Sequence, residues 1–440
     1  MSSIDRPSKK PTRRKFIKAA ATTTAAGAAV SVLPKTSFGY HNSENNTLRV
    51  GLVGCGGRGT QAVINALRAD EQTEVTAFAD AFEDRITLTA KGLAKNKVAK
   101  DRLNVPKENW FTGFDCFKNL INSNVDVVIL ATPPYFRPMQ MRAAVEAGKH
   151  VFCEKPVAVD APGVRSVLES CKLAEEKGLS VVSGLCWRYD IGVNAVIDKI
   201  KDGAIGDIVA MQENYLAPTL WHRGANEEWS EMENQLRNWV YYTWLSGDHI
   251  AEQHIHSLDK ALWLMGDEPP VKAYGTGGRI ARTNPKWGNV YDHFATVFEW
   301  ANGVKCFAHC RQMAGCFNDV NDYIIGTKGR ARILGKKDIV DHSNNLLWKY
   351  TQPKGEKKKN MYDVEHEHLF RSIREGKPIN NGKYMCYSTL MAVMGREAAY
   401  TGQVIEWDKL LASEEKLGPE KMEWGDFKPK KVAIPGNGEW

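Results

Sequence analysis

Long apolar runs are missing from this sequence of 440 residues. The most membrane-like stretch, residues 19–33, is short and rich in Ala and Thr, whereas a helix that crosses a bilayer needs about 20 apolar residues. We therefore expect no stable transmembrane segment. A disulfide framework is missing too, because the nine cysteines are odd in number and scattered from Cys55 to Cys386. The composition, 43% hydrophobic and 25% charged, is that of an ordinary globular chain with two or three domains.

An excess of charge is missing from most of the chain. Of the 59 Lys and Arg residues, eight lie in residues 1–39 beside one of the 52 acids, so the remainder carries 51 residues of each sign. Nucleic-acid binding without sequence preference depends on Lys and Arg that displace counterions from phosphates. A balanced body offers no such excess, and we expect no nucleic-acid partner.

The basic N-terminus contains a short motif. Residues 12–18 read Thr-Arg-Arg-Lys-Phe-Ile-Lys and precede the uncharged residues 19–33, which resembles a twin-arginine export signal. We assign residues 1–39 to this signal, with cleavage near Gly39 or retention as a membrane tether; a basic tail is the alternative. The resemblance implies a periplasmic or other extracytoplasmic location. It also implies a bound cofactor, because such signals export proteins that are already folded.

A glycine-rich turn separates a strand-like run, residues 48–53, from a helical pattern. The turn reads Gly54, Cys55, Gly56, Gly57, Arg58 and Gly59. Gly54 permits the tight turn, Gly56 lets the backbone approach a pyrophosphate, and Gly59 allows close packing of helix on strand. A strand, these glycines and a helix in this order predict a dinucleotide-binding site, with a plain turn as the alternative.

The next strand-like run ends in Asp80. A carboxylate at this spacing accepts a hydrogen bond from a ribose 2′-hydroxyl and repels a 2′-phosphate, so NAD is favoured. Arg58 and Arg85 keep NADP open, because a nearby Arg accommodates that phosphate.

Further strand-like runs alternate with helical ones, which predicts a parallel sheet covered on both faces. The runs are residues 125–131, 149–156 and 179–184. Ligands bind at the carboxyl ends of such strands. The residues there are Thr132, Pro133, Glu154 and Lys155. We assign residues 40–186 to this Rossmann domain.

The motifs together resemble the Gfo/Idh/MocA family, which includes glucose-fructose oxidoreductase and inositol dehydrogenase. They are the glycine turn, Ala131-Thr-Pro133, Glu154-Lys-Pro156 and His256-Ser-Leu-Asp259, over most of residues 48–410. The resemblance implies an α/β chain with an N-terminal Rossmann NAD(P)-binding domain. It further implies a C-terminal α/β domain, residues 187–410, with a large, mostly antiparallel open sheet, followed by a tail, residues 411–440. Such proteins act on a secondary alcohol of a sugar or cyclitol and form homodimers or homotetramers.

The resemblance also implies catalytic residues. Lys155 matches the lysine that contacts the reacting hydroxyl, and an ammonium group stabilises the charge that develops on that oxygen. His256 matches the general base. Glu252 stands where many relatives have Asp, so its longer arm leaves open whether it touches substrate or orients His256.

Helical spacing places His249, Glu252, Gln253 and His256 on one face, which predicts that all four point into one cleft. His249 is therefore a candidate substrate contact, whereas His254 lies off that face. The alternatives are a zinc or manganese site and a core cluster of histidines. Because the spacing lacks the His pair of common zinc helices, we expect no metal.

Other substrate candidates lie on either side. Residues 213–242 are rich in Trp and Tyr, which suit the apolar face of a sugar ring and equally suit a core. Within them Tyr242 is a candidate contact, and Arg188 follows the last Rossmann strand. Residues 294–300 and 304–309, joined by Asn302-Gly303, predict an antiparallel hairpin.

Export constrains the reaction. Little free NAD is available outside the cytoplasm, so the cofactor must stay bound and return to its starting state. We expect an oxidoreductase that acts on a sugar, cyclitol or derivative with a tightly bound, recycled cofactor. The alternative is redox-neutral glycoside hydrolysis, as in relatives that resemble α-N-acetylgalactosaminidase. A third hypothesis is a sugar-binding protein without activity.

Overall fold

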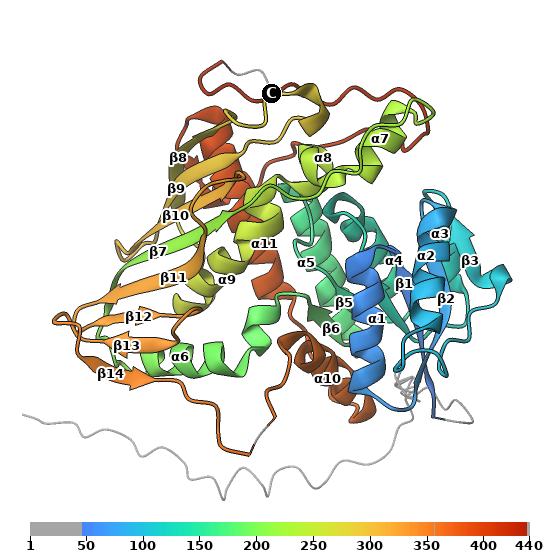
Figure 1. Ribbon diagram of the computed structural model, residues 1–440, viewed down its shortest axis with the longest axis horizontal. Coiled ribbons are helices and arrows are strands. Elements are labelled where there is room, and N and C mark those ends of the chain that lie inside the picture. Colours follow the sequence, from blue (N-terminus) through green and yellow to red (C-terminus); the bar gives the residue numbers. More distant parts are fainter. Residues whose placement is uncertain (1–45, 356, 438–440) are drawn as a thin grey trace, which may run out of the picture. The chain divides into compact units, whose positions relative to one another are not determined.

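The computed structural model describes residues 46–355 and 357–437, and Figure 1 shows their arrangement. The predicted export signal lies outside the described residues. Within them, none of the helices is long and apolar enough to span a bilayer.

The first sheet has six strands, all parallel, in the order β3-β2-β1-β4-β5-β6. Its strands are β1 (Leu48–Val53), β2 (Thr73–Asp80), β3 (Trp110–Thr112), β4 (Val127–Leu130), β5 (His150–Cys153) and β6 (Val181–Ser183). The helices between them are α1 (Gly57–Ala69), α2 (Glu83–Ala94), α3 (Cys116–Asn122), α4 (Arg137–Glu146) and α5 (Ala161–Glu176). β1, β4 and β5 are almost fully buried, as expected of strands covered on both faces. The predicted Rossmann arrangement is confirmed.

The second sheet has nine strands in the order β14-β13-β12-β11-β7-β10-β9-β8-β15. They are β7 (Ile208–Ala217), β8 (Lys272–Gly278), β9 (His293–Glu299), β10 (Lys305–Gln312), β11 (Asp319–Gly326), β12 (Arg330–Arg332), β13 (Asp338–Val340), β14 (Leu346–Lys349) and β15 (Ile405–Glu406). Only β7 and β10 pair in parallel; the other neighbours are antiparallel. The large, mostly antiparallel sheet is confirmed.

The predicted hairpin joins β9 and β10. Gly303 sits in the turn with a φ of 85°, a conformation that glycine adopts without strain. The strand burial alternates, so Cys306 and Cys310 face the core while His309 faces the other side. Cys306, His309 and Cys310 therefore cannot bind one metal ion together, although cysteine and histidine are metal-binding residue types.

The second sheet packs against helices on one side (Figure 1). The helices after β6 are α6 (Ile191–Lys201), α7 (Glu231–Arg237), α8 (Thr243–Ser246), α9 (Ile255–Leu264), α10 (Met361–Arg374), α11 (Gly382–Thr401) and α12 (Trp407–Leu411). α9 and α11 pack on each other and on the sheet. α10 packs instead on α1, and its Leu369 and Phe370 join the core of the first sheet. A segment from the predicted second domain thus completes the first.

Candidate active site

The glycine turn connects β1 to α1 with little room to spare. Gly54 has a φ of 98°, and a Cβ there would lie 2.6 Å from the carbonyl carbon of Ala131. A Cβ on Gly59 would lie 2.1 Å from the oxygen of Gly54. Gly56 and Gly57 face open space, with no atom within 4 Å of an added Cβ. The turn is therefore packed against protein at two glycines and open at the other two, where a phosphate could approach the amides that begin α1.

Asp80 ends β2 beside this turn. Its carboxylate accepts hydrogen bonds from the backbone N–H groups of Cys55 (2.7 Å) and Phe82 (3.0 Å). Burial raises the pKa of Asp80 to about 6, although these hydrogen bonds and Arg85 oppose the rise. The side chain thus fixes the turn, while its position at the pocket is the one predicted for a ribose contact.

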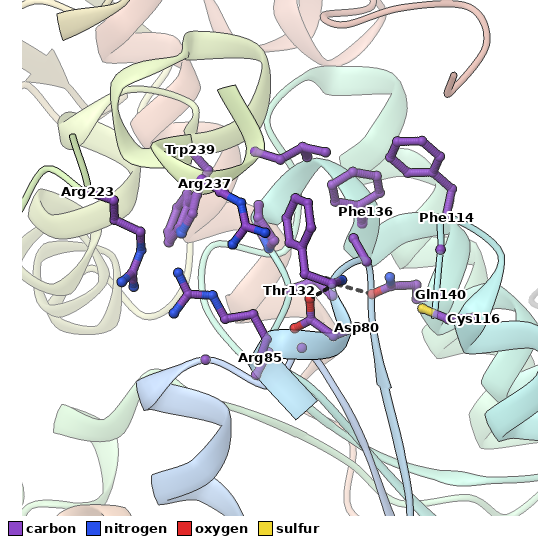
Figure 2. A pocket seen from close by; sticks show the side chains of 18 residues that line it. Asp80, Arg85, Phe114, Cys116, Thr132, Phe136, Gln140, Arg223, Arg237 and Trp239 are labelled. Carbon is purple, nitrogen blue, oxygen red and sulfur yellow. Dashed lines mark hydrogen bonds between the residues drawn. The ribbon is translucent and has the colours of Figure 1, made fainter. Parts of the chain in front are cut away.

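A pocket opens above the carboxyl ends of these strands (Figure 2). From the first domain it is lined by Gly54, Gly56, Asp80, Ala81, Phe82, Arg85, Gly113, Phe114, Cys116, Ala131, Thr132, Pro133, Phe136 and Gln140. From the second domain it is lined by Arg223, Leu236, Arg237 and Trp239. Of the predicted cofactor residues, the pocket gathers two glycines, Asp80, Arg85, Thr132 and Pro133. Aromatic side chains that line a pocket beside the glycine turn fit the adenosine half of a dinucleotide.

Arg137 connects two loops that follow β4 and β5. It is 4% exposed, and its guanidinium donates to the backbone oxygens of Thr132, Glu154 (3.0 Å) and Pro156. It therefore holds the Thr-Pro loop against the Glu-Lys-Pro loop. Sequence reasoning missed this residue, because a single Arg after a Pro-rich turn carries no pattern of its own.

Arg58 was predicted to contact the cofactor, but it does not line the pocket. It forms ion pairs with Glu154 and, at 2.8 Å, with Glu365, and it lies over the ring of Tyr362. Glu365 is fully buried on α10, and burial raises its pKa well above the usual range. This arrangement favours a role in joining the glycine turn to α10 over direct cofactor contact for both Arg58 and Glu154.

Lys155 and Glu252 form the centre of the candidate active site. The Lys155 Nζ lies 3.0 Å from Oε1 of Glu252 and also donates to the Glu252 backbone oxygen. Both side chains keep some exposure, 14% and 18%. Glu252 therefore contacts the lysine itself, and whether it also touches substrate or orients His256 stays a prediction.

His256 is the second residue of α9 and is partly exposed. Its Nδ1 is buried and has no hydrogen-bond partner among the described residues. Burial lowers the pKa of His256 well below its ordinary value, and the positive charges of Lys155, Lys260 and Arg58 lower it further. The imidazole is therefore neutral near pH 7, the form in which one ring nitrogen carries a free lone pair.

The prediction of a single α-helical face is wrong. Ile250–His254 forms a π-helical turn, which widens the helix and changes which side chains align. His249 is buried, with Nδ1 2.9 Å from Oδ1 of Asp248 and its ring against Phe294. Gln253 bonds to Gln312 instead. Among the residues that the structure describes, no group of three His, Cys, Asp or Glu side chains could hold a metal ion.

The remaining substrate candidates lie elsewhere. Arg188 is held by Asp259 (2.9 Å) and Asp267 (2.6 Å) and lies over Tyr384, which favours a role in anchoring α9. Tyr242 is buried and accepts a hydrogen bond from Asn234 (3.2 Å). It lines a separate groove formed with the C-terminal tail.

Comparison with known proteins gives two adjacent matches. Residues 48–185 match the family description "Oxidoreductase family, NAD-binding Rossmann fold", and residues 193–332 match "GFO/IDH/MocA C-terminal domain". The chain belongs to the Gfo/Idh/MocA family. NAD binding by its Rossmann domain agrees with the predicted cofactor.

Relatives of the chain differ in what their names say they do. The chain is 30% identical over 233 residues to "2,7-anhydro-N-acetylneuraminate hydratase" of Escherichia coli, covering 52% of this chain and 57% of that one. It is 24% identical to "Inositol 2-dehydrogenase 3" of Saccharopolyspora erythraea, covering 82% and 95%. The chain spans just over half the length of the first curated relatives that it matches.

A solved structure shares the fold. Levoglucosan dehydrogenase in complex with NADH and levoglucosan has a TM-score of 0.64 and 20% identity, covering 82% of this chain and 99% of that one. Identity at this level supports the architecture of both sheets and no finer statement.

Proposed function

We propose that the protein is an NAD-dependent oxidoreductase that acts on a secondary hydroxyl of a sugar, cyclitol or sugar derivative. The observation that carries the proposal is the Lys155–Glu252 pair beside His256, at the carboxyl edge of an NAD-binding sheet. The names of the inositol and levoglucosan dehydrogenases support a polyol or sugar as the substrate class.

The open face of the glycine turn fits a dinucleotide, because Gly56 leaves space that a Cβ would fill. Gly56, Gly57 and the first amides of α1 would hold the pyrophosphate, and Asp80 and Arg85 would lie beside the adenosine ribose. Asp80 favours NAD over NADP. The bound nicotinamide supplies a hydride acceptor or donor.

The chain's own residues handle the proton and the charge. Lys155 donates a hydrogen bond to the reacting oxygen and stabilises the negative charge that develops there. His256 takes the hydroxyl proton at its imidazole, with Nε2 as the accepting atom because Nδ1 is buried. Glu252 holds the ammonium group in place.

A second candidate function is redox-neutral hydrolysis or hydration of a sugar. The hydratase relative favours it, because adding water causes no net oxidation. In this reaction the sugar is oxidised transiently, the leaving group is eliminated, and water adds before the carbon is reduced again. The same Lys155 and His256 serve both reactions.

We further propose that the protein is exported through its N-terminal Arg-Arg motif and keeps its cofactor bound. Retention follows from the location, since a cofactor that left an exported enzyme would not be replaced. A homodimer or homotetramer is proposed as well. Apolar side chains such as Val209, Phe307 and Ile325 stand exposed on central strands of the second sheet, where a partner subunit would cover them.

The test starts from protein purified without added nucleotide. Acid release and mass spectrometry measure bound NAD, and oxidation is followed with a panel of cyclitols and sugars by reduced-nicotinamide absorbance. Release of nitrophenol from aryl glycosides without net NADH separates the second candidate. Lys155→Met and His256→Asn should each lower activity at least about 100-fold while bound NAD is unchanged.

Lys177→Met provides a matched control, because this lysine only donates to backbone oxygens at the end of α4. Full activity in either active-site variant would overturn the role assigned to that residue. Protein that neither contains nor binds NAD would leave the sugar-binding hypothesis in its place.

A further inference from the structure

The pocket at the glycine turn has an outer wall from the second domain. Arg223, Leu236, Arg237 and Trp239 line the same pocket as Gly54, Gly56 and Asp80 (Figure 2). These residues belong to residues 220–239, which we call the covering segment. A ligand on the glycine turn would thus be enclosed from both domains.

Arg237 fastens the covering segment to the first domain. Its guanidinium donates to both carboxylate oxygens of Asp84, each at 3.1 Å, in the first turn of α2. It also bonds to Glu233 at 2.8 Å and lies over the ring of Phe82, 4.0 Å from its centre. The wall is therefore held at the point where Phe82 enters the pocket.

Two other guanidinium groups at the pocket donate no hydrogen bond to an acid among the described residues. Arg223 donates no hydrogen bond from its guanidinium to any described residue and lies over Trp221. The carboxylate nearest to Arg85 is Asp84 at 4.0 Å, beyond hydrogen-bond distance. In Figure 2 the Arg223 and Arg85 side chains lie to one side of the view, whereas Asp80, whose own oxygens are engaged by backbone amides, lies beside Thr132. The pocket thus presents to a ligand two guanidinium groups whose N–H donors bond to no carboxylate of the described residues.

The C-terminal tail lies over the same region. Trp424 packs against Phe114, with 4.4 Å between ring centres, and against Phe82 at 5.5 Å. The next residues bond to the covering segment: Gly425 accepts from the N–H of Met232 (3.0 Å) and Phe427 from the side chain of Gln235 (2.6 Å). The tail therefore connects both walls, since Phe82 and Phe114 belong to the first domain.

We propose that the covering segment and the tail form a clasp over the adenosine diphosphate half of the dinucleotide, in which Arg85 and Arg223 bind its phosphate and ribose oxygens and Trp424 holds the clasp shut. The inference rests on the proposed function and deepens it, because it gives cofactor retention a structural cause. Opening the clasp requires the Arg237–Asp84 ion pair and the Trp424 contacts to separate together. Dissociation of the cofactor is slow for that reason.

The experiment uses the full chain, stripped of nucleotide with charcoal and reloaded with radiolabelled NAD. The release rate of the label is measured in excess unlabelled NAD for wild type, Trp424→Ala, Trp424→Phe and Arg223→Ala. Trp424 is 48% exposed, so removal of its ring is compatible with folding. Arg330→Ala is the control, because this half-buried arginine lies on β12, bonds to Asn344 and does not line the pocket. Binding of ADP-ribose and of nicotinamide mononucleotide is then measured by calorimetry.

Trp424→Ala and Arg223→Ala should each release NAD at least about ten-fold faster than wild type, and Trp424→Phe should restore slow release. Both alanine variants should weaken ADP-ribose about ten-fold and leave nicotinamide mononucleotide unchanged. Release rates equal to the control, or equal losses for both ligands, would overturn the clasp while leaving NAD binding intact. Wild-type protein that takes up no NAD would instead overturn the proposed function itself.

Discussion

At the scale of single residues, the contact between Lys155 and Glu252 defines how the reacting oxygen is held. The carboxylate reaches the ammonium group at 3.0 Å from the π-helical turn. We expect Glu252→Asp to lower kcat about 10- to 100-fold, because an arm shorter by one methylene leaves the ammonium group about 1 Å out of place. Steady-state kinetics measure the effect, and bound NAD serves as the internal control. Glu252→Gln keeps the reach and loses the charge, so it separates the effect of position from that of charge. Equal kcat in wild type and the Asp variant would contradict a positioning role.

His366 offers a test of electrostatics in the core. It is fully buried on α10, stacks on Phe152, and has no hydrogen-bond partner for either ring nitrogen among the described residues. Burial lowers the pKa of His366 well below its ordinary value, and Arg58 lowers it further. The unfolded chain therefore takes up a proton below about pH 6.5 while the native ring stays neutral, which costs native stability up to about 1.4 kcal/mol per pH unit.

We expect His366→Phe to remove this cost. Relative to wild type, the free energy of unfolding of the variant should rise by about 2 kcal/mol between pH 7.5 and pH 5.0. Urea denaturation at the two pH values measures the difference, and comparison of variant with wild type cancels the opposite contribution of buried acids such as Glu213. A difference that does not change with pH would show that the native ring accepts the proton.

At the scale of elements, two glycines of the β1–α1 turn allow the stability of the fold and the binding of NAD to be tested separately. Gly59→Ala places a methyl group against the oxygen of Gly54, so α1 must move away from β1, and we expect a loss of about 3 kcal/mol in unfolding free energy. Gly56→Ala meets no protein atom and should leave stability unchanged while weakening NAD at least ten-fold, because its methyl group enters the pocket. Thermal unfolding and calorimetric NAD titration measure the two effects. Gly57→Ala, also in open space, is the control for stability.

These elements also show how far the sequence predicts the structure. The β1 turn, the parallel strands and the β9–β10 hairpin follow from patterns within about 15 residues, and the structure contains all three. The π-helical turn at Ile250–His254 does not follow, because the same letters fit an α-helix equally well. The partner of Arg58 was missed for another reason, since Glu365 lies 307 positions away on a helix that crosses from the predicted second domain.

At the scale of the whole molecule, the two domains share one ligand site. Lys155 comes from the first sheet and Glu252 from a helix of the second domain, and the clasp spans both as well. A dinucleotide bound there would therefore stabilise contacts between the domains. The export proposal implies that folding with the cofactor precedes transport.

The export proposal predicts a separation between location and cofactor content. Replacing Arg13 and Arg14 by Lys keeps the charge but removes the paired arginines of the motif. We expect the variant to remain in the cytoplasm, whereas wild type is recovered from the periplasmic fraction, and we expect both to carry the same amount of NAD per chain because the site lies in residues 46–437. Cell fractionation with immunoblotting measures the first effect and acid release of NAD the second. Periplasmic recovery of the variant would contradict the twin-arginine route, and wild type that loads with NAD only after export would contradict the proposed order of cofactor binding and transport.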